Sequence, residues 1–262
     1  MKGTLYGVGI GPGDPELLTL KAVRIIKESA VIAVPGKKRE DTVAYQIVKQ
    51  IISNLDQKEF LEVEMPMTKD KDLLEKSHRE GAERICRILE NGRDVAFLTL
   101  GDPTIYSTYL YLHKQILKKG YSAKIINGIP SFCAAAARLN TGLVEKSEPL
   151  HVIPASYPAE DALKLTGTRV LMKAGKNMAN IKRLLKQDKK ECKNECDNNC
   201  SNECSSECDN ECSSGSHEWE VMMVENCGMP GEKISYGIDE INEKAGYYSL
   251  IIIKEKKEKD HD

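Results

Sequence analysis

Short apolar runs alternate with longer segments of helical periodicity through the first half of the chain. The apolar runs, each typical of a strand, cover residues 4–8, 30–35, 60–64, 94–100 and 122–126. Between them, apolar side chains recur every three or four positions, which predicts helices over residues 16–28, 42–53, 73–91 and 108–119. Strands that alternate with helices favour a mainly parallel sheet with right-handed crossovers.

The second half has the same ingredients in a different order. A helix is predicted over residues 132–139, and strands over residues 150–154, 169–173, 220–224, 233–237 and 247–253. Fewer strand–helix–strand units occur here, so we expect a mixed sheet in a second domain. The pattern therefore predicts an α/β protein with one domain over residues 1–127, a second over residues 128–255 and a charged tail over residues 256–262.

Composition narrows the class of protein. The chain has 262 residues, of which 40% are hydrophobic, enough for one large core or two compact ones. Its 38 Lys and Arg residues are balanced by 40 Asp and Glu residues, so the net charge of -2 gives no electrostatic case for nucleic-acid binding. The chain opens with no secretory signal and carries no apolar run of membrane-spanning length. We expect a soluble cytoplasmic protein.

Six of the nine cysteines lie in a low-complexity tract over residues 187–217. They recur at every fourth position among Asn, Asp, Glu and Ser, at residues 192, 196, 200, 204, 208 and 212. Almost nothing apolar separates them, so we interpret the tract as an insert rather than part of a core. The spacing fits none of the usual zinc patterns, yet such a density of soft thiolates suits zinc, copper or cobalt. Metal binding and a disordered loop both stay open.

Two glycine-bearing loops follow predicted strands. Residues 7–15 read GVGIGPGDP after the first strand, and residues 101–106 read GDPTIY after the fourth. Glycine permits tight turns and a close approach of the backbone to a ligand. Ligands of open parallel sheets bind beyond the carboxyl ends of the strands, so we expect the loops to meet at one small-molecule site. The alternative is that both are ordinary strand-to-helix turns.

The glycine pattern departs from the known phosphate-binding motifs. Gly-x-Gly-x-x-Gly fails in both registers, because Asp14 or Pro12 stands at the third glycine position, and no P-loop motif occurs. Asp14 and Asp102 would repel phosphate. They suit a ligand that is cationic and rich in hydroxyl and amino donors, and S-adenosylmethionine is both.

These residues resemble a known family. Residues 8–19, VGIGPGDPELLT, resemble the opening of the tetrapyrrole (corrin/porphyrin) methylases, and Gly101-Asp102-Pro103 with Tyr106-Ser107 is similar to the family's second signature. The strings GDPTIYS at 101–107, NGIPSF at 127–132 and VLMK at 170–173 are most similar to the branch that methylates C20 of precorrin-2 or its cobalt form, cobalt-factor II. The resemblance covers the chain except for the cysteine tract and the tail.

The resemblance implies two α/β domains with the active site in the cleft between them, a homodimer, and S-adenosylmethionine as methyl donor in cobalamin biosynthesis. Carried across position by position, it implies that the donor is bound by Pro12, Gly101, Asp102, Thr104, Ile105, Tyr106, Ser131, Phe132, Met172, Asn226 and Cys227. The acceptor would be a tetrapyrrole, with cobalt-factor II favoured over metal-free precorrin-2. Arg138 and Lys173 are candidates for pairing with its carboxylates.

Alternatives from two classes remain at this point. One is a sister methylase that acts on another ring carbon or on uroporphyrinogen. The other is a metal-binding protein that works through its cysteine-rich tract. The sequence identifies neither a catalytic base nor a resident metal site.

Overall fold

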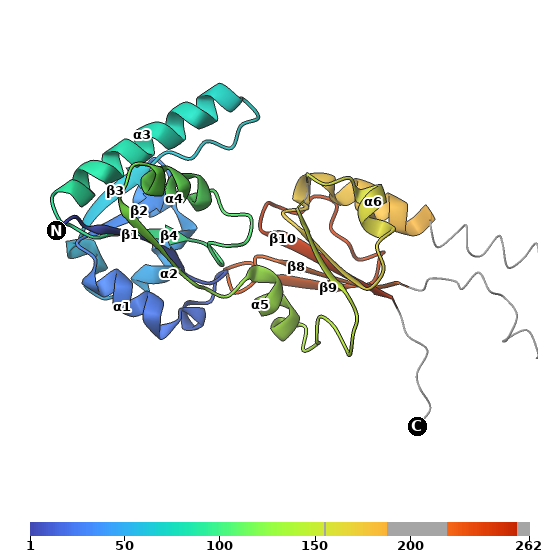
Figure 1. The fold of residues 1–262 in the computed structure, drawn as a ribbon. Coiled ribbons are helices and arrows are strands. Elements are labelled where there is room, and N and C mark those ends of the chain that lie inside the picture. Colours follow the sequence, from blue (N-terminus) through green and yellow to red (C-terminus); the bar gives the residue numbers. More distant parts are fainter. Residues whose placement is uncertain (155, 188–218, 256–262) are drawn as a thin grey trace, which may run out of the picture. The chain divides into compact units, whose positions relative to one another are not determined.

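The computed structural model describes residues 1–154, 156–187 and 219–255 (Figure 1). The chain divides into two compact units, Met1–Ala134 and Ala135–Asp262, which are treated separately below. The cysteine tract lies almost wholly outside the described residues, and the tail over residues 256–262 lies entirely outside them. None of the described helices is both long enough and apolar enough to span a membrane.

The first unit is built on a five-stranded parallel sheet. Its strands are β1 (Thr4–Gly9), β2 (Val31–Pro35), β3 (Glu59–Val63), β4 (Val95–Thr99) and β5 (Ser122–Ile126), in the order β3-β2-β4-β1-β5. All five lie within one residue of the predicted bounds. The parallel sheet that the sequence predicts is confirmed.

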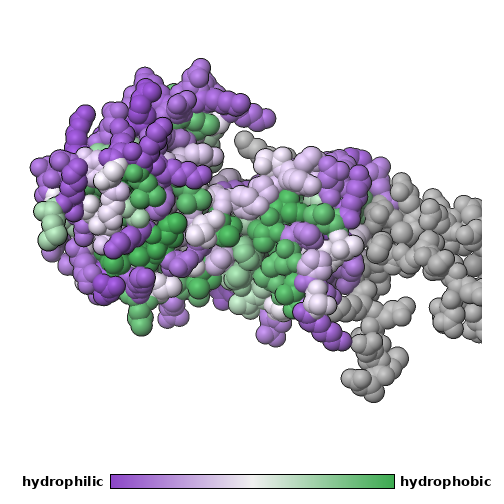
Figure 2. Space-filling view, viewed as in Figure 1, coloured by the Kyte–Doolittle hydropathy of each residue, from purple (hydrophilic) through white to green (hydrophobic). Residues whose placement is uncertain are grey.

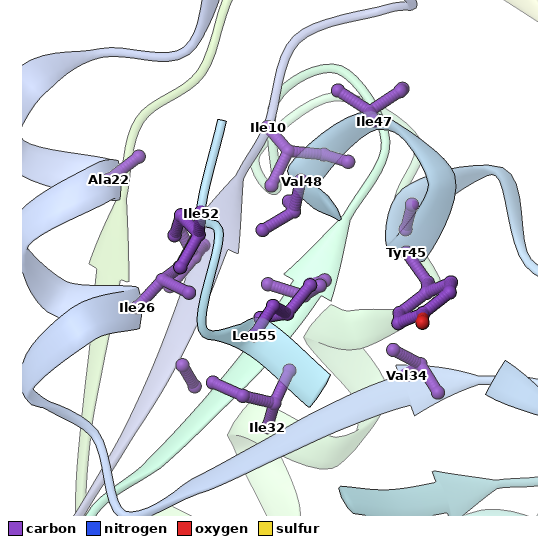
Figure 3. Packing of buried hydrophobic residues seen from close by; sticks show 14 of the residues in the cluster. Ile10, Ala22, Ile26, Ile32, Val34, Tyr45, Ile47, Val48, Ile52 and Leu55 are labelled. Atoms are coloured by element: carbon purple, nitrogen blue, oxygen red, sulfur yellow. The ribbon is translucent and has the colours of Figure 1, made fainter. Parts of the chain in front are cut away.

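Helices cover both faces of this sheet. On one face, α1 (Leu20–Glu28) and α2 (Val43–Lys49) pack onto Val8, Ile32 and Leu98 of the strands. Figure 3 shows Ile32 of β2 in this cluster, together with Ile26 of α1 and Val48 of α2. On the other face lie α3 (Lys71–Glu90) and α4 (Tyr109–Lys118), which bury Leu5, Val31 and Phe97. The outward side of α3 is hydrophilic (Figure 2). Side chains of one strand thus alternate between two cores, as buried parallel strands require.

The first predicted helix is interrupted near its start. Asp14 caps a short 3-10 helix, Pro15–Leu17, and the chain is extended again at Leu18. Thr19 then caps α1, because its side chain accepts a hydrogen bond from the Ala22 N–H. The single helix expected over residues 16–28 is therefore wrong at its first turn.

The order of strands creates a switch point between β1 and β4. From β1 the chain crosses to β2 on one side of the sheet, whereas from β4 it crosses to β5 on the other. The two loops therefore leave neighbouring strands in opposite directions, and ligands of open α/β sheets bind at such a switch point.

The second unit has a mixed sheet, as the sequence predicts. Its strands are β6 (Leu150–Pro154), β7 (Thr168–Met172), β8 (Trp219–Glu225), β9 (Lys233–Tyr236) and β10 (Ser249–Glu255), in the order β6-β7-β10-β8-β9. Only β6 and β7 pair in parallel, and the other neighbours are antiparallel. One face packs against α6 (Ala159–Leu163) and a helical segment over residues 178–187. Helix α5 (Ser131–Arg138) begins in the first unit and ends in the second.

Candidate functional site

The carboxyl ends of β1, β4 and β5 meet on three glycines. A Cβ atom built on Gly128 would lie 2.2 Å from the carbonyl oxygen of Gly101 and 2.8 Å from the Cα atom of Gly9. A Cβ atom on Gly9 would lie 2.4 Å from the backbone nitrogen of Gly128. Contacts this short are incompatible with any side chain, so backbone packs directly on backbone at the switch point. The NGIP turn after β5 therefore belongs to the same cluster as the two glycine loops.

The loops after β1 and β4 are also joined by hydrogen bonds. Gly101 N–H donates to the Gly11 carbonyl at 2.8 Å, and Gly11 N–H donates to the Gly101 carbonyl at 3.3 Å. Both glycines have positive φ angles, 76° at Gly11 and 71° at Gly101. Pro12 follows in this loop and is buried. The prediction that the two loops meet is confirmed.

Asp102 holds the β4 loop to the β5 loop. Its carboxylate accepts hydrogen bonds from Thr104 N–H at 2.7 Å and Gly128 N–H at 2.9 Å, and also from the Thr104 hydroxyl and the Asn127 amide. The side chain is 6% exposed. Burial acts to raise the pKa of Asp102, but the hydrogen bonds outweigh it and hold the pKa below its ordinary value. The geometry makes Asp102 an organiser of the loops, whereas the sequence indicates this residue only as a ligand of the donor.

The loop beyond Asp102 exposes its side chains. Thr104 and Tyr106 are exposed and Ile105 is half-buried. Tyr106 has a φ of 46°, a left-handed conformation that costs energy for a bulky residue. Strain of this kind gathers at ligand-binding sites, where the surrounding structure imposes it. These three predicted donor contacts therefore share one strained and accessible loop.

Tyr109 anchors the end of this loop and was missed by sequence reasoning. Its ring is fully buried and fills the space beside Gly7. A Cβ atom built on Gly7 would lie only 2.0 Å from the ring carbon Cε1 of Tyr109. Its hydroxyl lies 3.0 Å from His113 Nδ1. Burial raises the pKa of Tyr109, and a hydrogen bond with the backbone of Gly7 offsets part of this increase. Gly7 is thus required by the packing of the core. No local motif links Gly7 to Tyr109, because the two residues lie far apart in the sequence.

Thr99 is a second residue that the sequence did not single out. It is the last residue of β4 and is 7% exposed, and within the part of the chain that the structure describes its hydroxyl has no hydrogen-bond partner. A buried polar group without a partner costs free energy. This hydroxyl lies directly before the glycine cluster, at the carboxyl end of a switch-point strand.

Two further predicted contacts open helix α5. Ser131 is half-buried, and Phe132 is 8% exposed. Both follow the turn at Gly128, so the structure brings them next to the glycine cluster along the chain. Five of the eight predicted donor contacts of the first unit thus lie on the loop after β4, two lie at the start of α5, and Pro12 lies on the loop after β1.

The remaining predicted contacts lie in the second unit, where the ends of β7 and β8 meet the start of β10. Met172 ends β7 and pairs with Leu250, while Asn226 and Cys227 follow β8, whose last residue pairs with Ser249. Met172 and Cys227 are buried. Asn226 is left-handed with a φ of 51°, and its N–H donates to the Tyr248 carbonyl at 2.8 Å. Three strand ends therefore converge here as well.

Of the two candidates for carboxylate pairing, Arg138 is already in an ion pair. Its Nε lies 3.2 Å from Glu232 Oε2. Lys173, directly after β7, has its ammonium 5.6 Å from the centre of the Tyr247 ring. No group of three or more His, Cys, Asp or Glu side chains suited to a metal ion occurs among residues 1–154, 156–187 and 219–255.

Comparison with known families identifies the family of this chain. The family model for Tetrapyrrole (Corrin/Porphyrin) Methylases matches residues 4–237. This chain belongs to that family. Two relatives of this methylase are "Probable cobalt-precorrin-2 C(20)-methyltransferase" of Methanocaldococcus jannaschii, 41% identical over 64% of this chain and 71% of the relative, and "Cobalt-precorrin-2 C(20)-methyltransferase" of Salmonella typhimurium, 30% identical over 98% of each chain.

Solved structures agree on the fold of this methylase. Uroporphyrin-III C-methyl transferase from Thermus thermophilus, complexed with S-adenyl homocysteine, matches with a TM-score of 0.64 and 21% identity. The match covers 96% of this chain and 97% of that chain. The family and the α/β fold predicted from the sequence are both confirmed.

Proposed function

We propose that this methylase transfers a methyl group from S-adenosylmethionine to C20 of a precorrin-2-type tetrapyrrole in cobalamin biosynthesis. The family match over residues 4–237 carries the proposal, together with relatives whose names specify C20 of cobalt-precorrin-2. Both of those names specify the cobalt form, which favours cobalt-factor II as acceptor over metal-free precorrin-2.

The glycine cluster fits such a donor. A Cβ atom on Gly101 would meet nothing nearer than 3.9 Å, so the backbone is open to a ligand there, whereas Gly9 and Gly128 pack backbone against backbone. We assign the donor's methionine and ribose parts to the loop over residues 101–106 and its adenosine part to Ser131, Phe132, Met172, Asn226 and Cys227. When bound, S-adenosylmethionine supplies a methyl group activated by the positively charged sulfur.

Positioning is the main contribution of the protein in this proposal. Holding two reactants in line is worth about 7–11 kcal/mol of the barrier in well-oriented systems. Asp102 fixes the loop that carries Thr104 and Tyr106, so it acts on the donor through the backbone. The nucleophile is an electron-rich ring carbon of the acceptor, which needs no activation by the protein, so no catalytic triad is required.

The identity of the acceptor carbon is tested directly. Enzyme and donor carrying a ¹³C methyl group are incubated anaerobically with cobalt-factor II, precorrin-2 and uroporphyrinogen in separate reactions. We expect a new methyl signal at C20 with the first two acceptors and faster turnover with cobalt-factor II. A methyl group at another carbon, or on uroporphyrinogen alone, identifies a sister methylase instead.

Donor binding is tested separately by calorimetry. We expect S-adenosylhomocysteine to bind with a micromolar or lower Kd, and NAD and ATP to give no heat. Tight binding of a nicotinamide or a triphosphate in place of S-adenosylhomocysteine would contradict the proposed use of the glycine loops.

The cysteine tract is not required for methyl transfer in this proposal. Deleting residues 190–214 removes all six clustered cysteines, and we expect kcat and KM within about twofold of the intact chain, because low-complexity inserts contribute little to a packed core. Titration of the intact and deleted proteins with zinc and cobalt measures any metal capture by the tract. Loss of activity in a folded deletion protein would show that the insert belongs to the site.

The family resemblance also supports a cytoplasmic homodimer. Sedimentation of the purified chain tests the dimer. Activity in the soluble cytoplasmic fraction of the producing cells tests the location.

A further inference from the structure

A pair of half-exposed tyrosines stands at the edge of the second sheet where Met172, Asn226 and Cys227 lie. Tyr247 is 43% exposed and Tyr248 is 40% exposed, and their rings meet edge to face with centroids 5.2 Å apart. They directly precede β10, between the ends of β7 and β8. Exposed aromatic residues in a cluster mark binding surfaces more often than isolated ones do.

The backbone beneath these rings is tightly held. Asn226 N–H donates to the Tyr248 carbonyl at 2.8 Å, and the Ser249 hydroxyl donates to the Gly246 carbonyl at 2.6 Å. A Cβ atom on Gly175 would lie 2.3 Å from the same Gly246 oxygen. The rings are therefore accessible while their attachment is fixed, which lowers the entropy cost of binding a ligand.

Lys173 adds a positive charge to the tyrosine pair. Its ammonium lies 5.6 Å from the Tyr247 ring centre, and its φ of 58° is left-handed. Asn226, on the opposite side of β10, is also left-handed. Asparagine adopts this conformation readily, so the strain lies at Lys173, and such strain persists where surrounding structure imposes a functional geometry.

The nearby carboxylates are already bound to other groups. Both Glu225 oxygens accept from the Asn242 amide at 3.0 and 3.1 Å. Glu232 Oε2 accepts from Gly228 N–H and lies 3.2 Å from Arg138 Nε. Glu225 is buried and the charge of Glu232 is matched by Arg138, so this face combines the two aromatic rings with the ammonium of Lys173.

We infer that Lys173, Tyr247 and Tyr248 form an acceptor platform, on which a flat, carboxylate-bearing tetrapyrrole lies against the rings and pairs a carboxylate with the ammonium. Charge selects this occupant over the donor, since S-adenosylmethionine carries a sulfonium that a lysine repels, whereas the acceptor is polyanionic. The inference rests on the proposed function and extends it to a binding face of which the sequence indicates only Lys173.

The test uses two probes on the full chain. Uroporphyrin, a stable planar tetrapyrrole rich in carboxylates, is titrated by its fluorescence in the presence of saturating S-adenosylhomocysteine. S-adenosylhomocysteine alone is titrated by calorimetry. The variants are Lys173→Asn, whose residue type tolerates a left-handed backbone, together with Tyr247→Leu and Tyr247→Phe.

We expect Lys173→Asn to weaken uroporphyrin binding about tenfold and to flatten its salt dependence, as the loss of one charge-assisted contact does. Tyr247→Leu should weaken it about fivefold, while Tyr247→Phe, which keeps the ring, stays within twofold. Affinity for S-adenosylhomocysteine should stay within twofold in every variant. Lys164→Asn and Tyr236→Leu remove a lysine and a tyrosine exposed elsewhere on this unit, and both should leave uroporphyrin affinity unchanged.

Three results would overturn the platform, and a fourth would overturn the proposed function on which it rests. Unchanged uroporphyrin affinity in Lys173→Asn and Tyr247→Leu rejects it, and a parallel loss of S-adenosylhomocysteine affinity assigns the face to the donor. A wild-type chain that binds S-adenosylhomocysteine but no uroporphyrin rejects the platform while the donor site stands. A wild-type chain that binds neither probe rejects the proposed function itself.

Discussion

Gly128→Ala is expected to destabilise the chain by about 3 kcal/mol or more and to abolish donor binding. The added Cβ atom would lie 2.2 Å from the Gly101 carbonyl oxygen and 2.7 Å from the Gly9 carbonyl carbon. Overpacking ordinarily costs about 1–3 kcal/mol, and here the cost lies at the upper end because the opposing atoms are backbone and cannot rotate away. Relief requires β5 to move from β1, which separates the loops that the proposed donor contacts occupy.

Urea unfolding and calorimetry with S-adenosylhomocysteine measure both effects. Gly142→Ala is the matched control, since its Cβ atom would meet only the Val144 carbonyl oxygen at an ordinary 3.6 Å. We expect that control within about 0.5 kcal/mol of the natural chain. If Gly128→Ala matched the control in stability and donor affinity, the close packing of the three strand ends would be refuted.

Asp102→Asn is expected to cost about 2–4 kcal/mol at neutral pH. Each carboxylate oxygen accepts from a backbone N–H, one from Thr104 and the other from Gly128. An asparagine keeps one acceptor and turns an NH₂ group toward the other N–H, so two donors face each other in a buried position. The β4 and β5 loops then lose one of their links, and we expect at least tenfold weaker binding of S-adenosylhomocysteine.

The effect of this substitution depends on pH with a defined sign. The folded-state pKa of Asp102 is lowered, so the folded chain binds fewer protons here than the unfolded chain does near pH 4. The stabilisation is complete above the unfolded pKa and is lost as pH falls through the folded one. The stability difference between the natural chain and Asp102→Asn should therefore stay constant from pH 7 to about pH 5 and shrink below about pH 4.

Urea unfolding at a series of pH values follows this difference. Asp161→Asn is the control, because it breaks only an exposed ion pair with Lys164 and should change stability by less than about 1 kcal/mol at any pH. A constant gap between the natural chain and Asp102→Asn down to pH 3 would show that the carboxylate charge does not stabilise the loops.

The sequence predicts strands better than helix ends in this chain, for a physical reason. Runs such as Val31–Pro35 are apolar on both faces, and only a strand buried between two helical layers accommodates that pattern. The first helix is predicted one turn too early because Leu17, Leu20 and Val23 sit at helical spacing across its start. Periodicity does not detect that the Thr19 hydroxyl caps a new helix.

The candidate site was predicted in location but only partly in role. Parallel-sheet topology alone indicates that the loops after β1 and β4 share an edge. That Gly9, Gly101 and Gly128 pack backbone to backbone depends on the twist and spacing of three strands, which no local motif encodes. The same holds for Asp102, since its partner Gly128 lies on a different strand end.

The position of β1 in its sheet has a consequence for how the chain is made. Leu5 of β1 pairs with Val95 and Ala123, so β1 leaves the ribosome well before its two partner strands are translated. At typical elongation speeds, roughly 5–20 s pass before the earlier partner exists. During this time β2 and β3 are able to pair with each other, whereas the backbone groups on both sides of β1 have no partner strand. A chain that terminates before Val95 therefore keeps β1 unpaired on both sides, and unpaired strand edges promote aggregation.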